Sequence, residues 1–462
     1  MKRIIAIIIL VTMCLTFSNN VFGEEAYPVT WIRDDYRTTI FKEGMLLVYK
    51  SKANNNGYEY GFLDQKGKEA VPLIYDDAQG FSEGLAAVRK DGKCGYVDKT
   101  GKVIIPFVYD SAWSFSDGFA RVIKDKKWYY IDKTGKNVIG PLDYEEVSDF
   151  KNGFATIESY YTYGLIDKKG KVVVPLKYQS IQDFHEGLAI VSDWDSNGKR
   201  RYGAINTAGK LIIPIVYNHI GEFNDGVANA TKNYKCGVID RNGKVIVQFK
   251  YSNIECFNNG LAQVIDGTDL YNHKYAFINK TGKFVIPFSY NKYDYQFSDG
   301  LAAIEIKDKV TNKVKVGFVN TAGKMVIQPK YGDMTTGPQH TFRNGFAIVS
   351  KGDDYTNAKY GIIDKTGKEI VPIIYDSVGD YSSGMYSFYN DGLAIVSKDG
   401  KVGAVDPTGK TVIPMIFDSM QEFSNGVTLG QIGGRTCIIE KPLKKAAASS
   451  YTVVLIGREI SL

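Results

Sequence analysis

Apolar and polar positions alternate in short stretches that predict β-strands, and the same alternation returns through most of the chain. It is clearest from residue 81 to residue 109, where three short apolar stretches are separated by turn residues. Short stretches rich in Val, Ile and Tyr between turn signals are typical of strands. The predicted strands are Gly84–Val88, Cys94–Asp98 and Val103–Ile105.

Turn residues join these strands into two hairpins. Asp91-Gly92 is a strong signal for a two-residue hairpin turn. Asp98 begins a second turn, in which Gly101 takes the left-handed conformation and the carboxylate accepts backbone N–H groups. Pro106 ends the third strand or marks an edge, because proline cannot donate to a strand ladder.

This unit recurs eleven times between about residue 41 and about residue 440. Each copy opens on a bend with an aromatic residue followed three positions later by glycine. The aromatic residues are Phe41, Phe81, Phe115, Phe150, Phe184, Phe223, Phe257, Phe297, Phe342, Tyr389 and Phe423. Self-similarity at a spacing of 34 to 47 residues indicates a repeat architecture and not a set of unrelated domains.

The repeat predicts an all-β fold. A three-stranded unit cannot bury enough apolar surface alone, so neighbouring units must stack. We expect three-stranded antiparallel units stacked as an open β-solenoid or superhelix, with propeller-like closed rings as the alternative. A ring usually has about 4 to 8 blades of four strands, so eleven three-stranded units favour the open form.

The amino terminus has the layout of a secretory signal peptide over residues 1–23. Two basic residues precede an apolar run, and Gly23 supplies a small residue before the expected cut. A lipoprotein signal at Cys14 is the alternative, but Met13 stands where a small residue is needed. No later apolar run is long enough to span a bilayer, so we expect a secreted or cell-surface protein without a transmembrane segment in the mature chain.

Two further segments flank the array of residues 41–440. Residues 24–40 are predicted to be a lead-in that covers the open end of the first unit. Residues 441–462 are predicted to be a linker followed by a possible capping strand, Tyr451–Ile456, on the last unit.

The recurring motif resembles the bacterial WG-repeat family. Its elements are an aromatic residue before Gly, an Asp-x-x-Gly-Lys turn, an Ile-Pro pair, a Tyr, and Phe-x-x-Gly-Leu-Ala. Trp128 alone keeps the Trp of the family, and Tyr129 follows it in place of Gly. The resemblance covers residues 41–440. It implies a repeat scaffold, often secreted, and it carries over no catalytic residue.

Charge argues against nucleic-acid binding, and the placement of the cysteines argues against structural disulfides. Without the signal peptide the chain has 55 Lys and Arg against 51 Asp and Glu, a balance too even to predict nucleic-acid binding. Cys94 and Cys236 occupy the same place in different units, which would hold them too far apart to pair. We therefore expect no structural disulfide.

Three local patterns contain residue types found in phosphate-binding or metal-binding sites, but their spacing does not match those sites. Gly409–Thr411 resembles the end of a phosphate-binding loop, but Ala404 stands where a glycine is required. Asp193–Gly198 resembles the first half of a calcium loop, but Ala204 replaces the final Glu, so an acidic hairpin tip is the better interpretation. The histidines have no metal-binding spacing and are expected in loops or on the surface: His185, His219, His273 and His340. No catalytic residue, cofactor or metal site is predicted.

The candidate ligand surface is the set of positions that vary between units. The fourth residue of the Gly-Leu-Ala-x-Val strand differs from unit to unit, as in Arg121, Thr156, Asn229 and Gln263. We expect these side chains to point away from the Ala/Val packing face and to bind a ligand across several units. Repeated Asp98-type and Lys102-type residues could add charged ladders, although solvated turns explain them more simply.

These patterns predict a secreted, non-enzymatic scaffold for a cell-wall glycan or for a peptide or protein partner. The alternative is a structural or assembly protein of the cell envelope, and a hydrolase is less expected. Aromatic residues after the third strand, such as Tyr109, are assigned to packing, but exposed aromatic residues would suit glycan or peptide stacking.

Overall fold

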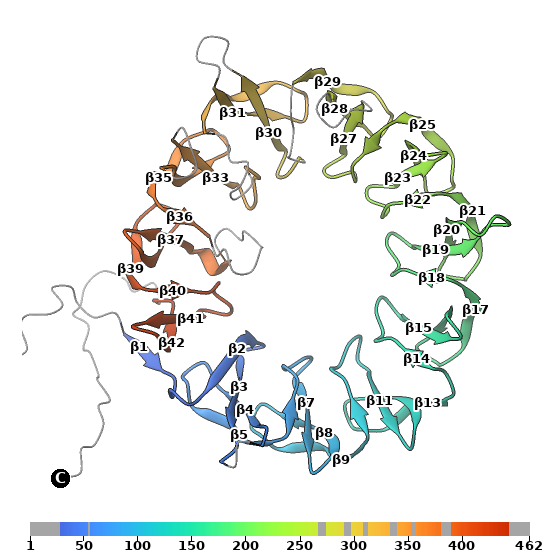
Figure 1. Cartoon of the computed structure of the whole chain (residues 1–462), viewed down its shortest axis with the longest axis vertical. Coiled ribbons are helices and arrows are strands. Elements are labelled where there is room, and N and C mark those ends of the chain that lie inside the picture. The colour runs from blue at the N-terminus through green and yellow to red at the C-terminus, as the bar shows by residue number, and fades with distance from the viewer. Residues whose placement is uncertain are drawn as a thin grey trace, which may run out of the picture.

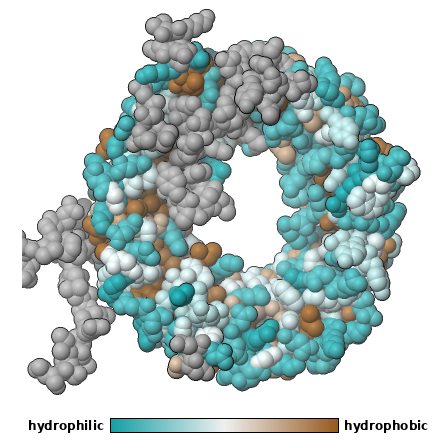
Figure 2. All heavy atoms as spheres, in the orientation of Figure 1, coloured by the Kyte–Doolittle hydropathy of each residue, from teal (hydrophilic) through white to brown (hydrophobic). Residues whose placement is uncertain are grey.

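The protein folds into a ring of small antiparallel sheets (Figure 1), and the space-filling view shows that the centre of the ring is open (Figure 2). A computed structural model describes residues 28–442, except residues 54–55, 267–273, 291–296, 308–312, 333–339, 353–356 and 380–389. Within these residues there are eleven sheets, nine of four strands and two of three. We number them as blades 1 to 11 in chain order, from β2–β5 to the sheet of β40–β42 and β1.

Each blade runs from a strand beside the central opening to a strand on the outer rim, and within the described residues nine of the eleven begin with an additional inner strand (Figure 1). The innermost strands are β2 (Arg37–Lys42), β6 (Asp77–Ala78), β10 (Ser111–Ala112), β14 (Glu146–Val147), β18 (Ser180–Ile181), β22 (His219–Ile220), β26 (Asn253–Ile254), β36 (Ser377–Val378) and β40 (Ser419–Met420). The second strands are β3 (Met45–Ser51), β7 (Leu85–Lys90), β11 (Ala120–Lys124), β15 (Phe154–Ser159), β19 (Leu188–Trp194), β23 (Val227–Lys232), β27 (Leu261–Asp266), β30 (Leu301–Lys307), β33 (Phe346–Lys351), β37 (Ala394–Lys398) and β41 (Val427–Ile432).

The third and outer strands complete the blades. The third strands are β4 (Tyr58–Leu63), β8 (Lys93–Asp98), β12 (Lys127–Ile131), β16 (Thr162–Asp167), β20 (Arg200–Asn206), β24 (Lys235–Asp240), β28 (Lys274–Asn279), β31 (Val314–Asn320), β34 (Lys359–Asp364), β38 (Lys401–Val405) and β42 (Arg435–Glu440). The outer strands are β5 (Glu69–Tyr75), β9 (Val103–Tyr109), β13 (Asn137–Leu142), β17 (Val172–Tyr178), β21 (Leu211–Tyr217), β25 (Val245–Tyr251), β29 (Phe284–Tyr290), β32 (Met325–Tyr331), β35 (Glu369–Tyr375), β39 (Thr411–Phe417) and β1 (Val29–Trp31). A short 3-10 helix, η1, spans Asn390–Gly392.

The fold is the propeller-like ring, and the preferred expectation of an open solenoid is not confirmed. Three-stranded units were expected, but most blades have a fourth strand of only two residues, such as β10, which pairs Ser111 with Ile123 and Ala112 with Val122. A two-residue strand has no apolar periodicity to detect. The extra strand lies beside the opening, where it contributes to the sheet and leads into the bend before the second strand.

The ring closes through its amino-terminal segment. Residues 29–31, expected to cover the first unit, instead form β1 and pair antiparallel with β42 of blade 11. Ile32 is 3% exposed and packs in one cluster with residues of blades 1 and 11, among them Leu46 and Leu429. Arg435 Nε lies 2.9 Å from an Asp34 carboxylate oxygen, and the Arg435 guanidinium stacks on the Trp31 ring. The proposed capping segment, Tyr451–Ile456, lies outside the described residues.

The hydrophobic core is divided among the spaces between blades. One face of blade 2 places Ala86 and Val88 against blade 1, and the other places Leu85 and Ala87 against blade 3. The bend aromatic residues that the structure describes are buried in these spaces. For example, Phe115 packs edge-to-face on Tyr96 of the preceding blade, with ring centroids 5.1 Å apart. Each blade therefore depends on both neighbours for burial of its apolar side chains.

The glycine near the start of the third strand allows the outer strand to approach closely. A Cβ atom on Gly95 would lie 2.6 Å from the Ile105 carbonyl oxygen, so a side chain there would clash with β9. Blade 3 has Tyr129 at this position, and its outer strand β13 carries Gly140 instead, where a Cβ atom would meet the Trp128 carbonyl oxygen at 2.8 Å. Among the described residues, no helix is long and apolar enough to cross a membrane.

Candidate binding surface on the hairpin tips

The variable positions expected to bind a ligand lie between blades and are not a free surface. Gln263 is 6% exposed, and Asn229 Nδ2 donates to the Ile254 carbonyl oxygen of the next blade. The prediction from strand alternation was wrong because both faces of every blade are covered. In an isolated strand pair one face is free, but in a closed ring the second face packs on the next blade.

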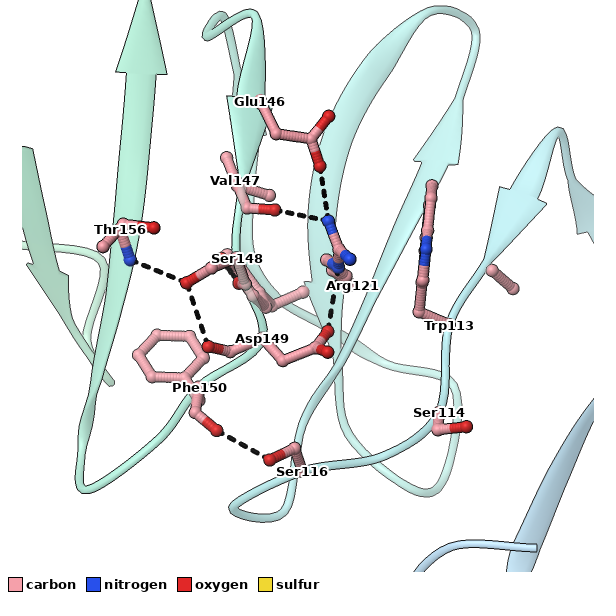
Figure 3. Close-up of polar contacts among 12 residues, drawn as sticks. Trp113, Ser114, Ser116, Arg121, Glu146, Val147, Ser148, Asp149, Phe150 and Thr156 are labelled. Carbon is pink, nitrogen blue, oxygen red and sulfur yellow. Dashed lines mark hydrogen bonds and ion pairs between the residues drawn. The ribbon is translucent and has the colours of Figure 1, made fainter. Parts of the chain in front are cut away.

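Arg121 shows how such a position is used (Figure 3). Its side chain is 15% exposed and joins β11 of blade 3 to β14 of blade 4. The guanidinium donates to Asp149 at 2.8 Å through Nε, and to Glu146 at 2.5 Å and the Val147 carbonyl oxygen at 2.6 Å through Nη1. It also lies over the Trp113 ring, 4.5 Å from the centroid. Both Nε and Nη1 donate to residues of blade 4, so Arg121 connects the two blades.

The repeated turn carboxylates also accept hydrogen bonds within the fold. Asp98 accepts hydrogen bonds from the Thr100 hydroxyl and from the backbone N–H groups of Thr100 and Lys102. These donors, the Thr100 hydroxyl first, hold the pKa of Asp98 below its usual value. The predicted turn is therefore confirmed, and its carboxylate does not stand free as part of a charged ladder.

A second set of polar side chains links bends of neighbouring blades. Where the third residue of the bend is acidic, its carboxylate accepts a hydrogen bond from the glycine N–H of the following blade. The pairs are Glu43 with Gly84, Glu83 with Gly118, Asp117 with Gly153, Glu186 with Gly226, Asp225 with Gly260, Asp299 with Gly345 and Asp391 with Gly426. Acidic residues of this set therefore act as inter-blade connections.

The hairpin tips between the second and third strands lie at the opposite end of the blades from these bends. Where the tip has two residues, both have positive φ, as a type I′ turn requires. The described tips of this kind are Asp91-Gly92, Asp125-Lys126, Tyr160-Tyr161, Asn233-Tyr234, Asp399-Gly400 and Gly433-Gly434. One backbone conformation is thus kept while the side chains change.

Aromatic residues occupy the tips of three consecutive blades. Tyr160 and Tyr161 of blade 4 are 84% and 82% exposed, and Tyr234 of blade 6 is 74% exposed. Between them, Trp194 of blade 5 is 55% exposed at the end of β19. Because all blades are oriented alike in the ring, these four side chains lie on the same side of it. We call Tyr160, Tyr161, Trp194 and Tyr234 the aromatic ledge.

The longer hairpin of blade 5 contains the acidic stretch that resembled a calcium loop. Trp194 pairs with Arg200 across the hairpin. Asp195 accepts hydrogen bonds from the N–H groups of Asn197 and Lys199, and Arg201 lies 2.8 Å away. Arg201 and the turn amides lower the pKa of Asp195 to about 2. The structure thus places an acidic hairpin tip here, with the Asp195 carboxylate already bonded.

The histidines are spread through the ring. His185 Nε2 lies 3.8 Å from a Glu222 carboxylate oxygen, and the His219 ring centroid is 5.9 Å from that of Tyr202. His340 lies in a loop but is buried, whereas His273 lies outside the described residues. No group of three or more His, Cys, Asp or Glu side chains that could hold a metal ion occurs in the part of the chain that the structure describes.

The recurrence matches a known repeat. The WG containing repeat matches the chain ten times, at residues 60–94, 95–128, 130–159, 163–193, 202–236, 237–267, 275–309, 317–355, 360–401 and 403–434. The chain belongs to the WG containing repeat family. Each WG repeat begins near the third strand of one blade and ends near the second strand of the next, so it spans the space between blades. No curated protein matches the sequence.

Two solved structures are distantly similar to this WG-repeat ring. The crystal structure of the eukaryotic initiation factor shares 11% identity, covers 71% of this chain and 95% of its own, and has a TM-score of 0.35. The extracellular domain of the putative hybrid two component system BT3049 from B. thetaiotaomicron shares 11% identity, covers 93% of this chain and 73% of its own, and has a TM-score of 0.21. At these scores neither likeness bears on function.

Sequence reasoning missed the aromatic ledge, although the signal was present. The unit predicts an Asp-Gly turn at the tip, and Tyr160-Tyr161 and Asn233-Tyr234 stand in its place in blades 4 and 6. Bulky residues with positive φ are outliers, because their Cβ atom crowds the backbone. A departure from local turn preference often marks a position used for something other than folding.

Proposed function

We propose that this protein is an exported, non-enzymatic scaffold that binds a cell-envelope polymer, or a peptide or protein partner, with the hairpin tips on one side of the ring. The observation that carries the proposal is the constancy of the tip backbone beside the variety of its side chains. Asp91-Gly92 and Tyr160-Tyr161 adopt the same left-handed turn. A rigid frame with interchangeable exposed residues suits recognition.

The frame supports a binding role better than a catalytic one. The recurring Asp and Glu side chains accept hydrogen bonds within turns or from the next blade, as Asp98 and Glu83 do. Export is supported by the apolar run of residues 4–17 behind two basic residues. The nearly even balance of charges in the mature chain supports a partner other than nucleic acid.

Co-sedimentation with isolated cell wall tests this proposal. The purified full mature ring is mixed with cell-wall fragments and, in parallel, with an immobilised panel of cell-surface proteins and peptides. We expect saturable binding to the wall or to one defined member of the panel. Failure to bind both would reject the proposal, because an envelope-binding scaffold must retain one of these partners.

A structural role in the envelope is the second candidate, and the outer rim favours it. Apolar side chains recur exposed on the outer strands, including Ile74, Val108, Val216 and Ile374. Concentration-dependent self-association in sedimentation velocity, together with absence of wall binding, would favour assembly over recognition.

A further inference from the structure

We propose that the aromatic ledge of blades 4, 5 and 6 is a binding site for a linear polysaccharide of the cell wall whose sugar faces are uncharged. The inference rests on the proposed function and deepens it by naming the site and the chemistry of the ligand. Four aromatic side chains of high exposure follow one another along one side of the ring.

The shape of the site favours sugar rings over a protein anchor. Energetically important residues of protein interfaces usually sit in well-packed, desolvated pockets. Tyr160, Tyr161 and Tyr234 are instead 74–84% exposed and project from the tips of hairpins. A flat aromatic ring with an apolar face and a polar edge can stack on the C–H face of a sugar without a surrounding pocket.

The spacing of the tips favours a chain of sugars. Facing sheets pack about 10 Å apart, so equivalent tips of neighbouring blades recur at about that interval. This interval is close to the length of a disaccharide unit in an extended polysaccharide. Three blades would then contact successive disaccharides of one chain, and the combined contacts would strengthen binding without any deep site.

The two arginines of the blade 5 hairpin are bonded within the protein. Arg201 is bonded to Asp195. Arg200 donates through Nε to the Ser192 hydroxyl and through Nη2 to the Gln179 carbonyl oxygen. Exposed Asn197 and Asn233 beside the rings can exchange hydrogen bonds with the hydroxyl and amide groups of a sugar chain.

The turn conformation gives an independent reason to assign the tyrosines a role. Tyr160, Tyr161 and Tyr234 have φ of 52°, 60° and 62°, and the equivalent residues Asp91 and Gly92 have φ of 51° and 77°. Asp and Gly tolerate this region, whereas tyrosine is disfavoured there. The frame would accept Asp-Gly at these tips, so the exposed rings contribute nothing that the fold requires.

Calorimetric titration of the full mature ring tests the site. The probes are soluble β-1,4-linked oligosaccharides of N-acetylglucosamine and of glucose with two and six sugars, isolated cell-wall polysaccharide, and a proline-rich peptide. The peptide is included because a polyproline helix also repeats at about 9 Å. We expect a hexasaccharide to bind at least about tenfold more tightly than its disaccharide, because it reaches more than one tip.

The variant is built from the protein's own tip sequences. Tyr160→Asp with Tyr161→Gly reproduces the tip of blade 2, Tyr234→Gly gives Asn-Gly, and Trp194→Thr removes the indole. We expect this combined variant to lose at least about tenfold in sugar affinity. The matched control, Lys126→Gly, changes the same kind of turn in blade 3 without removing an aromatic ring and should bind as the unchanged protein does.

The outcomes separate the site from the general function. Equal affinity of the variant and the unchanged protein for sugars would overturn the ledge as the site. Binding of the peptide or of a surface protein, with no binding of any sugar probe, would overturn the glycan but leave the scaffold function standing. Binding of no sugar, wall fraction, peptide or surface protein would overturn both.

Discussion

The tips of blades 2 and 10 and those of blades 4 and 6 have the same backbone and opposite side-chain chemistry. Asp91-Gly92 and Asp399-Gly400 are residues that a type I′ turn prefers. Tyr160-Tyr161 and Asn233-Tyr234 hold the same positive φ with bulky rings. The first pair of tips can be explained by folding alone, and the second cannot. The tips of blades 4 and 6 are therefore the stronger candidates for a function beyond folding.

The two sets also show what holds the turn in place. In blade 2 the Asp76 carboxylate accepts the N–H of Asp91, and in blade 4 the Glu145 carboxylate accepts the N–H of Tyr160. Both acceptors lie in the connection that leads from the preceding outer strand. Because this support is independent of the tip side chain, the preceding connection fixes the turn and leaves the identity of the tip residues free to vary.

The largest expected loss of stability comes from weakening the junction that closes the ring, because both sets of tips are held by the same ring. Ile32→Ala removes a buried side chain at the junction of blades 1 and 11. Large-to-small changes at such sites cost about 2–5 kcal/mol. We expect the urea unfolding midpoint to fall, with far-UV circular dichroism as the measurement. Ile40→Ala, at a side chain that is 57% exposed, is the control. An unchanged midpoint for Ile32→Ala would show that closure contributes little.

The next largest expected effect is a loss of stability at acidic pH, which arises from a buried residue of the ring and not from the tips. Burial lowers the pKa of His340 to about 3, against about 6.5 in an unfolded chain. The unfolded state therefore binds the extra proton between these values, so stability falls as pH drops below about 6.5, by up to about 1.4 kcal/mol per pH unit.

A histidine exchange identifies the source of that acid dependence. His340→Leu should flatten the dependence of the unfolding free energy between pH 6.5 and pH 4.5, a range above the pH at which carboxylates such as Asp98 titrate. His185→Gln, at a half-exposed site, should leave the slope unchanged. If both variants keep the full slope, the acid sensitivity arises elsewhere.

A smaller effect is expected at Arg121, which lies in the strand that leads to the tip of blade 3. Arg121→Ala removes its hydrogen bonds to blade 4. We expect a loss of about 1–2 kcal/mol, since Glu146 and Asp149 remain partly solvated once the guanidinium is gone. Chemical denaturation measures it, and Lys124→Ala at an exposed position of β11 is the control. A loss no greater than that of the control would show that Arg121 does not couple the blades.

Much of the frame could be predicted from the sequence because each unit repeats the same local signals. The Asp-Gly hairpin turn and the Asp98 turn were both identified from residue type and spacing, and the structure has them where expected. Ring closure was predicted only as the alternative to an open solenoid. It depends on Val29–Trp31 meeting β42 across the whole chain, and a three-residue segment has no pattern that names its partner.

The candidate site was misplaced for a related reason. Alternation along a strand shows which residues share a face, but it does not show what covers that face. Arg121 and Gln263 were assigned to a ligand surface, and the ring buries them against the next blade. The aromatic ledge could be recognised only by aligning the tips and asking which residues the turn itself would not select.

A reciprocal exchange of tips has an expected effect no larger than that of Arg121→Ala, and it is the sharpest test of the comparison. Tyr160→Asp with Tyr161→Gly should raise the free energy of unfolding by about 1–2 kcal/mol, because tyrosine in the left-handed region costs about that much and glycine does not. Asp91→Tyr with Gly92→Tyr should lower it by a similar amount. Urea unfolding of both variants measures the two changes, and Lys126→Gly provides a third tip of the same conformation. Opposite signs would show that blades 4 and 6 keep their aromatic tips at a cost in stability. If the blade 4 exchange instead destabilises the ring, then the tyrosines support the fold and the distinction between the two sets of tips is wrong.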